Sequence, residues 1–221
     1  MRLAGFYHAA LSRSLSRLPA LLPGAQHRLA DTSAVAVTID DGPTAKGTPP
    51  LLEALTQSGI AATFFFTGIE AERHPKLVRD VVAQGHEAAS HGYTHDDLFF
   101  ASRETVHRDM LRSLDAIEQC CGVRPRCYRP PYGRINPFHM DIATRLDCTL
   151  VLWSRMPRDF DTRQKGAALL ENLRSVRGGD ILVLHDNAST LGRLPALVHA
   201  LARRLRETNL RAVRLSDGGD R

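Results

Sequence analysis

Two adjacent carboxylates, Asp40 and Asp41, follow an alternating apolar run and come directly before Gly42-Pro43. The run over residues 35–39 is typical of a strand, which the Gly-Pro pair would end. Successive side chains of a strand point to opposite faces, so one carboxylate could bind a metal ion while its neighbour accepts a proton. The same residue types are also common in solvated turns, and the stretch taken alone favours a turn.

His91 and His95 are the second feature that could do chemistry, because their four-residue spacing can bring two imidazoles to one site. With one Asp they would form a set of three ligands that leaves open positions for water and substrate, as catalytic zinc requires. A His-x-x-x-His pair carries little weight alone. Its combination with Asp40 and Asp41 indicates a metal-dependent hydrolase.

Two later segments, residues 128–133 and 182–186, supply the remaining parts of such a site. In the first, Arg129 can pair with a carboxylate, orient it and keep it ionised. The rigid prolines beside it can aim a backbone N–H, that of Tyr132, at a developing oxyanion. In the second, His185 follows an apolar strand and can act as a general acid.

The rest of the chain must bring these segments together. Strand and helix patterns alternate about seven times, which implies parallel strands joined by helical crossovers. A doubly wound open sheet and a closed barrel both fit. The barrel is favoured because the polar motifs follow different strands at their carboxyl ends, where barrel enzymes gather their catalytic groups. The expected helices are 49–59, 75–84, 104–121, 135–146, 165–176 and 195–206, and the later strands are 61–67, 86–90, 126–130, 148–153, 180–185 and 211–215.

The composition of the 221-residue chain, with 43% hydrophobic and 24% charged residues, is ordinary for one soluble globular domain. No apolar run is long enough to span a bilayer. The formal net charge of +5 is dispersed and no basic-aromatic motif accompanies it, so we expect no nucleic-acid partner. The four cysteines match no zinc-binding spacing and are expected to be free thiols. Nothing in the pattern specifies an oligomeric state.

The first thirty residues contain no acidic residue, and residues 11–22 have an amphipathic pattern. We expect a helical extension over 1–30, packed outside a domain that spans 31–221. Arg13 and Arg17 interrupt the apolar content, so no clear secretory signal is visible and a cytoplasmic or membrane-associated location is favoured. The helix could also lie on a membrane surface.

These motifs, in this order, resemble those of the polysaccharide deacetylase family, carbohydrate esterase family 4, whose catalytic unit is the chitooligosaccharide deacetylase homology domain. The resemblance runs from about Ser33 to about Leu215 and implies an irregular (β/α)7 barrel, a single catalytic domain and a bacterial source. It rests on Thr-x-Asp-Asp-Gly-Pro at 38–43, Ala-Thr-Phe-Phe at 62–65, Gly-His-Glu at 85–87, His-x-x-x-His at 91–95, Arg-Pro-Pro-Tyr at 129–132 and Leu-x-Leu-His at 182–185.

The resemblance also implies a reaction, the hydrolysis of an N-acetyl group from an amino sugar in a chitooligosaccharide-like or peptidoglycan-like glycan. Asp41, His91 and His95 would bind a divalent metal, usually zinc, with cobalt, manganese or nickel as alternatives. Asp40 would take a proton from the metal-bound water that acts as nucleophile, and Arg129 would hold Asp40.

The same resemblance assigns the leaving group and the substrate. His185 would protonate the departing amine. The backbone N–H of Tyr132 would stabilise the oxyanion, and Pro131, Trp153 and Leu184 would help to form the substrate site.

Three positions depart from the family pattern. Met156 stands where an Asp that pairs with the acid histidine is expected, so this partner is missing unless Asp159 or Asp186 replaces it. Losing such a partner typically costs about 10–100-fold in activity. Gly92 replaces a usual Ser or Thr, and Ile39 replaces a usual aromatic residue.

The departures leave other functions open. One alternative is a degenerate barrel that binds glycan or metal without turnover. A second alternative is the same hydrolytic reaction on a different substrate, either a lipid-linked amino sugar or an O-acetyl ester. The basic, amphipathic N-terminus is the only feature that suggests it.

Overall fold

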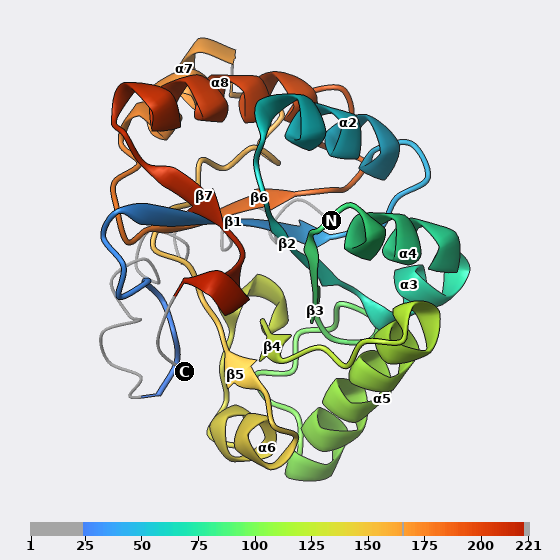
Figure 1. Ribbon diagram of the computed structural model, residues 1–221. Coiled ribbons are helices and arrows are strands. Elements are labelled where there is room, and N and C mark those ends of the chain that lie inside the picture. The colour runs from blue at the N-terminus through green and yellow to red at the C-terminus, as the bar shows by residue number, and fades with distance from the viewer. Residues whose placement is uncertain (1–23, 165, 219–221) are drawn as a thin grey trace.

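Parallel strands form one curled sheet in residues 24–164 and 166–218, the part of the chain that the computed structural model describes (Figure 1). Their order is β5-β4-β3-β2-β1-β6, and β7 pairs with the start of β1. Beyond β5, Arg155 forms a bridge to Leu182 in β6, which draws the two ends of the sheet together. The expected irregular barrel in one α/β domain is therefore confirmed. The strands are β1 (Ala34–Asp41), β2 (Thr63–Phe66), β3 (Glu87–Ser90), β4 (Cys127–Tyr128), β5 (Thr149–Leu150), β6 (Ile181–His185) and β7 (Arg211–Val213).

The helices cover the outside of the curled sheet, with α2, α7 and α8 along one side and α3, α4 and α5 along the next (Figure 1). One of them, α3, was not expected, because it has only six residues and is separated by His74 alone from the proline that begins α4. The helices are α2 (Thr48–Ser58), α3 (Gly68–Arg73), α4 (Pro75–Ala83), α5 (Arg103–Cys121), α6 (His139–Arg145), α7 (Gly166–Arg174) and α8 (Leu194–Glu207).

The side chains of β1 alternate between the two faces of the sheet. Val37 and Ile39 belong to the apolar cluster packed outward against the helices, whereas Ala34 and Ala36 belong to the cluster inside the barrel. Asp40 has the same parity as the two alanines, so it continues the interior face to the carboxyl end of the strand. The alternation therefore places the carboxylate of Asp40 at the mouth of the barrel.

Several elements are shorter than the sequence predicts, most clearly β4, β5 and α6. Prolines 125 and 130 flank β4 and have no N–H with which to extend the ladder. Beyond β5, Val151 pairs with Gln26 in an isolated bridge. Helix α6 begins at His139, after a turn in which the side chain of Asn136 accepts from the N–H of Phe138.

Residues 24–30, which fall within the helical extension expected over 1–30, are not helical and pack on the barrel. The backbone N–H of Gln26 donates to Leu150, and Arg28 forms an ion pair of 2.9 Å with Asp180. The folded domain therefore begins before residue 31. The amphipathic helix expected over residues 11–22 lies outside the described residues.

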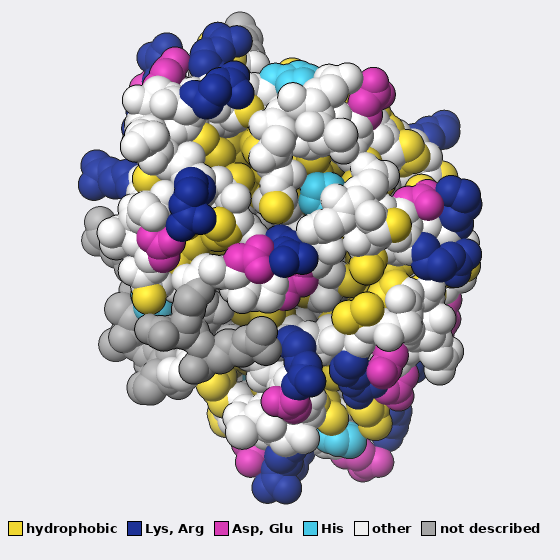
Figure 2. Space-filling view, in the orientation of Figure 1, with side chains coloured by type: hydrophobic (Ala, Val, Ile, Leu, Met, Phe, Trp, Pro, Cys, Tyr) yellow, Lys and Arg dark blue, Asp and Glu magenta, His cyan; other side chains and the backbone are white. Residues whose placement is uncertain are grey.

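The described surface gives no sign of a single strongly charged patch on the face shown in Figure 2. Lysine and arginine side chains are scattered there, and several adjoin acidic side chains. Among the described helices, none has the length and apolar composition of a membrane span.

Candidate active site

Asp41, His91 and His95 converge at the carboxyl ends of β1 and β3. One possible ligand atom of each lies within 4.8 Å of the others. The Nε2 of His95 is 3.2 Å from Oδ1 of Asp41, and the Nε2 of His91 is 3.7 Å from the same oxygen. The structure thus brings together the three residues that the sequence singled out as ligands.

Both carboxylates of the Asp pair reach this site, although strand alternation would place them on opposite faces. The Nε2 of His91 lies 3.8 Å from Oδ2 of Asp40 and 3.7 Å from Oδ1 of Asp41. The backbone explains the difference, because Asp41 has φ 80°, a region that residues other than glycine rarely adopt. Asp41 is the last residue of β1, and its unusual backbone conformation redirects the second side chain.

His91 is held in the form that binds metals. Its Nδ1 lies 2.8 Å from the carbonyl oxygen of Arg129, so Nδ1 carries the hydrogen and Nε2 presents a lone pair toward Asp41. Burial lowers the pKa of His91 to about 4, although the charge of Asp40 acts in the opposite direction. The imidazole is therefore neutral at pH 7.

Asp41 completes a donor set that fits a divalent metal. Burial would raise the pKa of Asp41, but the hydrogen bond from His95 and the charge of His185 hold it well below its usual range. One ionised carboxylate oxygen and two imidazole nitrogens suit zinc and other first-row divalent ions. These three residues could therefore hold such an ion.

Asp40 is anchored by a fully buried arginine. One guanidinium nitrogen of Arg129 lies 2.6 Å from Oδ1 of Asp40 and 2.8 Å from the hydroxyl of Thr38, and the other donates to the carbonyl of Leu152 at 3.0 Å. Burial lowers the pKa of Arg129, which the charge of Asp40 opposes. The ion pair occupies Oδ1 of Asp40 and leaves Oδ2 as the oxygen nearer His91.

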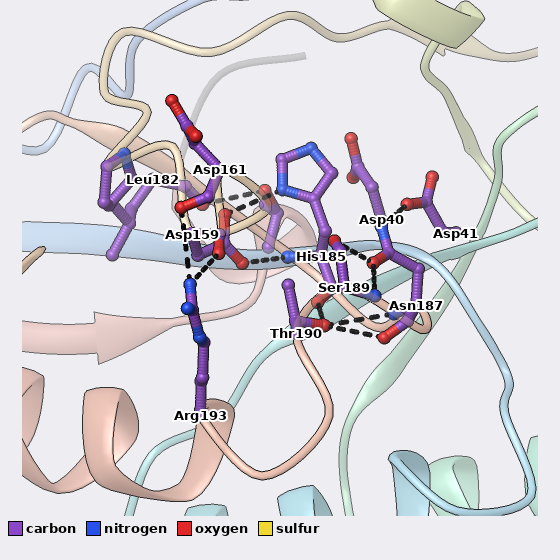
Figure 3. A network of polar contacts seen from close by, with 12 residues as sticks. Asp40, Asp41, Asp159, Asp161, Leu182, His185, Asn187, Ser189, Thr190 and Arg193 are labelled. Atoms are coloured by element: carbon purple, nitrogen blue, oxygen red, sulfur yellow. Dashed lines mark hydrogen bonds and ion pairs between the residues drawn. The ribbon is translucent and has the colours of Figure 1, made fainter. Parts of the chain in front are cut away.

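His185 has a carboxylate partner in Asp159, one of the two residues that the sequence left open as a replacement for the Asp expected at Met156. The Nδ1 of His185 lies 2.9 Å from Asp159, and the backbone N–H of His185 donates to the other oxygen of Asp159 at 2.7 Å (Figure 3). Burial would lower the pKa of His185, but the charge of Asp159 and its hydrogen bond raise it to about 9. Asp186, the other candidate, instead accepts hydrogen bonds from threonines 44 and 48.

Tyr132 lies beside the possible metal ligands. Its ring centroid is 4.6 Å from that of His95, and its backbone has φ 61°. Pro131 precedes it and is buried. Trp153 packs under the same turn, where a Cβ on Gly133 would come within 2.5 Å of its ring. These residues lie beside the site, and their roles in binding the substrate and the oxyanion stay predictions.

Leu184 does not belong to the site. It is fully buried in the cluster that packs against the helices, together with its register partner Ile39. Because one step along a strand reverses the face, Leu184 points away from the side on which His185 lies. The prediction of Leu184 as a substrate-site residue is therefore corrected. Ile39, the other departure from the family pattern, packs in the same cluster.

Asn187 and Asp109, which the sequence did not single out, hold the loops of the site together with Asp186. Asn187 donates to Oδ2 of Asp41 at 2.6 Å. Asp109, in α5, accepts the N–H of Tyr93 at 3.1 Å, between the two histidines of the 91–95 loop. Asp186 holds the loop after β1 by accepting hydrogen bonds from the hydroxyls of Thr44 and Thr48. The only signal in the sequence was proximity, since Asp186 and Asn187 directly follow His185.

Comparison with known proteins agrees with this geometry. The family model described as polysaccharide deacetylase matches residues 28–151. The chitooligosaccharide deacetylase of Sinorhizobium fredii is 39% identical over 153 residues, which cover 69% of this chain and 71% of that protein. A peptidoglycan-N-acetylglucosamine deacetylase of Bacillus cereus is 31% identical over 185 residues, 83% of this chain and 86% of that one.

A solved structure shares the fold. The family 4 carbohydrate esterase from Streptomyces lividans, in complex with acetate, superposes with a TM-score of 0.75 at 30% identity and covers 83% of this chain and 93% of that one. Sequence, fold and the ordered motifs around Asp41 and His91 thus agree. The chain belongs to the polysaccharide deacetylase family.

Proposed function

We propose that this protein is a metal-dependent deacetylase that hydrolyses the N-acetyl group of an amino sugar within a glycan. One observation carries the proposal: the cluster of Asp41, His91 and His95 lies beside the arginine-held carboxylate of Asp40. The printed names of the relatives, chitooligosaccharide and peptidoglycan-N-acetylglucosamine deacetylases, support the same substrate class.

Asp41, His91 and His95 would hold the ion. A divalent metal at this position would polarise the acetyl carbonyl and increase the acidity of a water molecule. Zinc is the first expectation for two imidazoles and one carboxylate, with cobalt, manganese and nickel as alternatives.

The other side chains would move the protons. Asp40 would accept a proton from the attacking water on Oδ2, because Arg129 occupies Oδ1. His185, whose pKa is raised to about 9, carries a proton at neutral pH and would donate it to the nitrogen as the C–N bond breaks. The hydroxyl of the water ends on the acetyl carbon, so the products are acetate and the free amino sugar. Tyr132 would contribute to binding the carbonyl oxygen.

The test is acetate release from N-acetylated chitooligosaccharides by zinc-loaded protein, with and without a chelator. We expect release that the chelator abolishes. Asp40→Asn should reduce it by about 10²–10⁴-fold, while the protein still binds zinc. Acetylated xylan serves as the ester substrate for comparison.

Two outcomes would count against the proposal. Zinc-loaded protein that releases no acetate from chitooligosaccharides or peptidoglycan fragments would favour the non-catalytic alternative, in which Asp40→Asn changes no rate. Release from the ester alone would favour the esterase alternative.

A further inference from the structure

Asn187 contacts one particular oxygen of Asp41. The Nδ2 of Asn187 donates to Oδ2 of Asp41 at 2.6 Å (Figure 3). The other oxygen, Oδ1, is the one that lies 3.2 Å from His95 and 3.7 Å from His91. Because the terminal torsion of an Asp side chain has a broad distribution, nothing intrinsic to the residue fixes the plane of its carboxylate. The bond to Asn187 fixes this plane, so that one oxygen faces the amide and the other faces the histidines.

The amide of Asn187 is itself held in one orientation. Its Oδ1 accepts the backbone N–H of Ser189 at 2.9 Å and the Ser189 hydroxyl at 2.6 Å. An amide oxygen that accepts two donors cannot exchange places with its nitrogen, so Nδ2 must point at Asp41. The hydroxyl of Thr190 fixes the same turn, because it accepts the Asn187 N–H and donates to the carbonyl of His185.

We propose that Asn187 is a positioning residue that fixes the orientation of the Asp41 carboxylate, with one oxygen toward His91 and His95, before a metal ion binds. The inference rests on the proposed function only in that these three residues hold the ion. Groups that hydrogen-bond to a metal ligand typically change metal affinity or activity by about 10–100-fold. Asn187 contacts one of the three possible metal ligands, so its effect appears first in metal affinity.

A simpler role is a tether between the end of β1 and the loop after β6. A tether would change the stability of the metal-free protein and leave the affinity of the folded protein for metal unaltered. A positioning residue changes the affinity. The two roles are therefore separable by measurements that do not depend on turnover.

The test compares two variants of this network with a matched control. Asn187→Leu removes the donor and keeps a side chain of similar size, and Ser189→Ala removes one of the two bonds that orient the amide. Thr208→Ala is the control, because it removes a side-chain hydrogen bond at the far end of α8. Each variant is titrated with Zn²⁺ in competition with a chromophoric chelator, and the absorption spectrum of its Co²⁺ form is recorded.

We expect the Zn²⁺ dissociation constant to rise about 10–100-fold in Asn187→Leu. The rise should be smaller in Ser189→Ala and absent in Thr208→Ala. The Co²⁺ bands should change in Asn187→Leu, while its metal-free melting temperature stays close to that of the wild type.

Unchanged Zn²⁺ affinity and an unchanged Co²⁺ spectrum in folded Asn187→Leu would overturn the inference. If that variant does not fold, Ser189→Ala decides, and unchanged affinity there overturns it equally. His91→Ala separates this failure from failure of the metal site itself. If His91→Ala loses Zn²⁺ and the Asn187 network has no effect, only the inference is lost; if His91→Ala binds Zn²⁺ as the wild type does, the proposed site is wrong as well.

Discussion

The imidazole of His185 and the carboxylate of Asp159 are 2.9 Å apart, and the same carboxylate also accepts the backbone N–H of His185 at 2.7 Å. Asp159 thus fixes both the ring and the main chain of one histidine. It is fully buried, and its own backbone carbonyl accepts a hydrogen bond from Arg193 at 3.4 Å (Figure 3). A buried carboxylate in this position favours the protonated form of the imidazole.

Replacing Asp159 with Asn should lower the pKa of His185, because the charge that raises it is removed. Deacetylation should fall by about 10–100-fold. If His185 is the general acid, the alkaline limb of the pH–rate profile should move to lower pH, since the proton is lost earlier. The measurement is acetate release between pH 6 and about 10.

Asp161→Asn is the matched control for this variant. The carboxylate of Asp161 bonds the exposed Arg163 two residues away, so its removal should leave the profile in place. An Asp159→Asn enzyme with full activity and an unmoved alkaline limb would show that the pair does not serve catalysis.

Regular secondary structure made much of this site predictable from the sequence. Asp40 and His185 end neighbouring parallel strands and are partners in the register, so their placement together follows from pattern alone. The alternation of β6 would also have placed Leu184 on the outer face.

The parts of the site on irregular backbone could not be predicted from the sequence. Asp41 turns with φ 80°, and Arg158, directly before the partner of His185, has φ 64°. Sequence periodicity does not predict a positive φ at such residues, because contacts from distant segments impose each of these conformations. The pairing of Asp159 with His185, across 26 residues of sequence, therefore required the structure.

The metal-free protein should lose stability at alkaline pH through His185. Its pKa is raised from 6.5 to about 9, so folding favours the protonated form. The stabilisation is complete below pH 6.5 and is lost as the pH rises through about 9. In this window the free energy of unfolding should fall by up to about 1.4 kcal/mol per pH unit.

Urea unfolding in the presence of a chelator, at several pH values between 6 and about 10, measures this slope. His185→Gln is the comparison, because it removes the titrating group and leaves the other ionisable groups in place. The wild type should lose more stability than the variant over this range. Equal slopes for the two proteins would refute the assignment.

The buried ion pair of Asp40 and Arg129 should behave as one unit in stability. Arg129→Met leaves the Asp40 carboxylate buried without its partner, and Asp40→Asn leaves the guanidinium, which has no exposed surface, without its counter-ion. Each single change should destabilise the protein by about 3–5 kcal/mol. The double variant should cost clearly less than the sum of the two.

Urea unfolding of all four proteins at pH 7 gives the coupling energy. Lys76→Met and Asp80→Asn provide the control cycle, since this pair lies on the exposed face of α4. Exposed pairs of this kind couple by only about 0.3–0.5 kcal/mol. Additive effects of the Asp40 and Arg129 changes would mean that the two residues do not stabilise the protein as one unit.

Zinc should stabilise the folded protein, because an ion that binds only the native state shifts the unfolding equilibrium. At a free concentration of 100 times the dissociation constant the gain is about 2.7 kcal/mol, and removal of the ion with a chelator should reverse it. His91→Ala should abolish the zinc-dependent rise in melting temperature, because it removes a buried imidazole whose Nε2 faces Asp41. His199→Ala removes an imidazole at the surface, where its Nδ1 contacts Ser58, and should keep the full rise. If zinc stabilised the His91→Ala protein as strongly as the wild type, the ion would bind elsewhere. The cluster of Asp41, His91 and His95 would then not be the metal site.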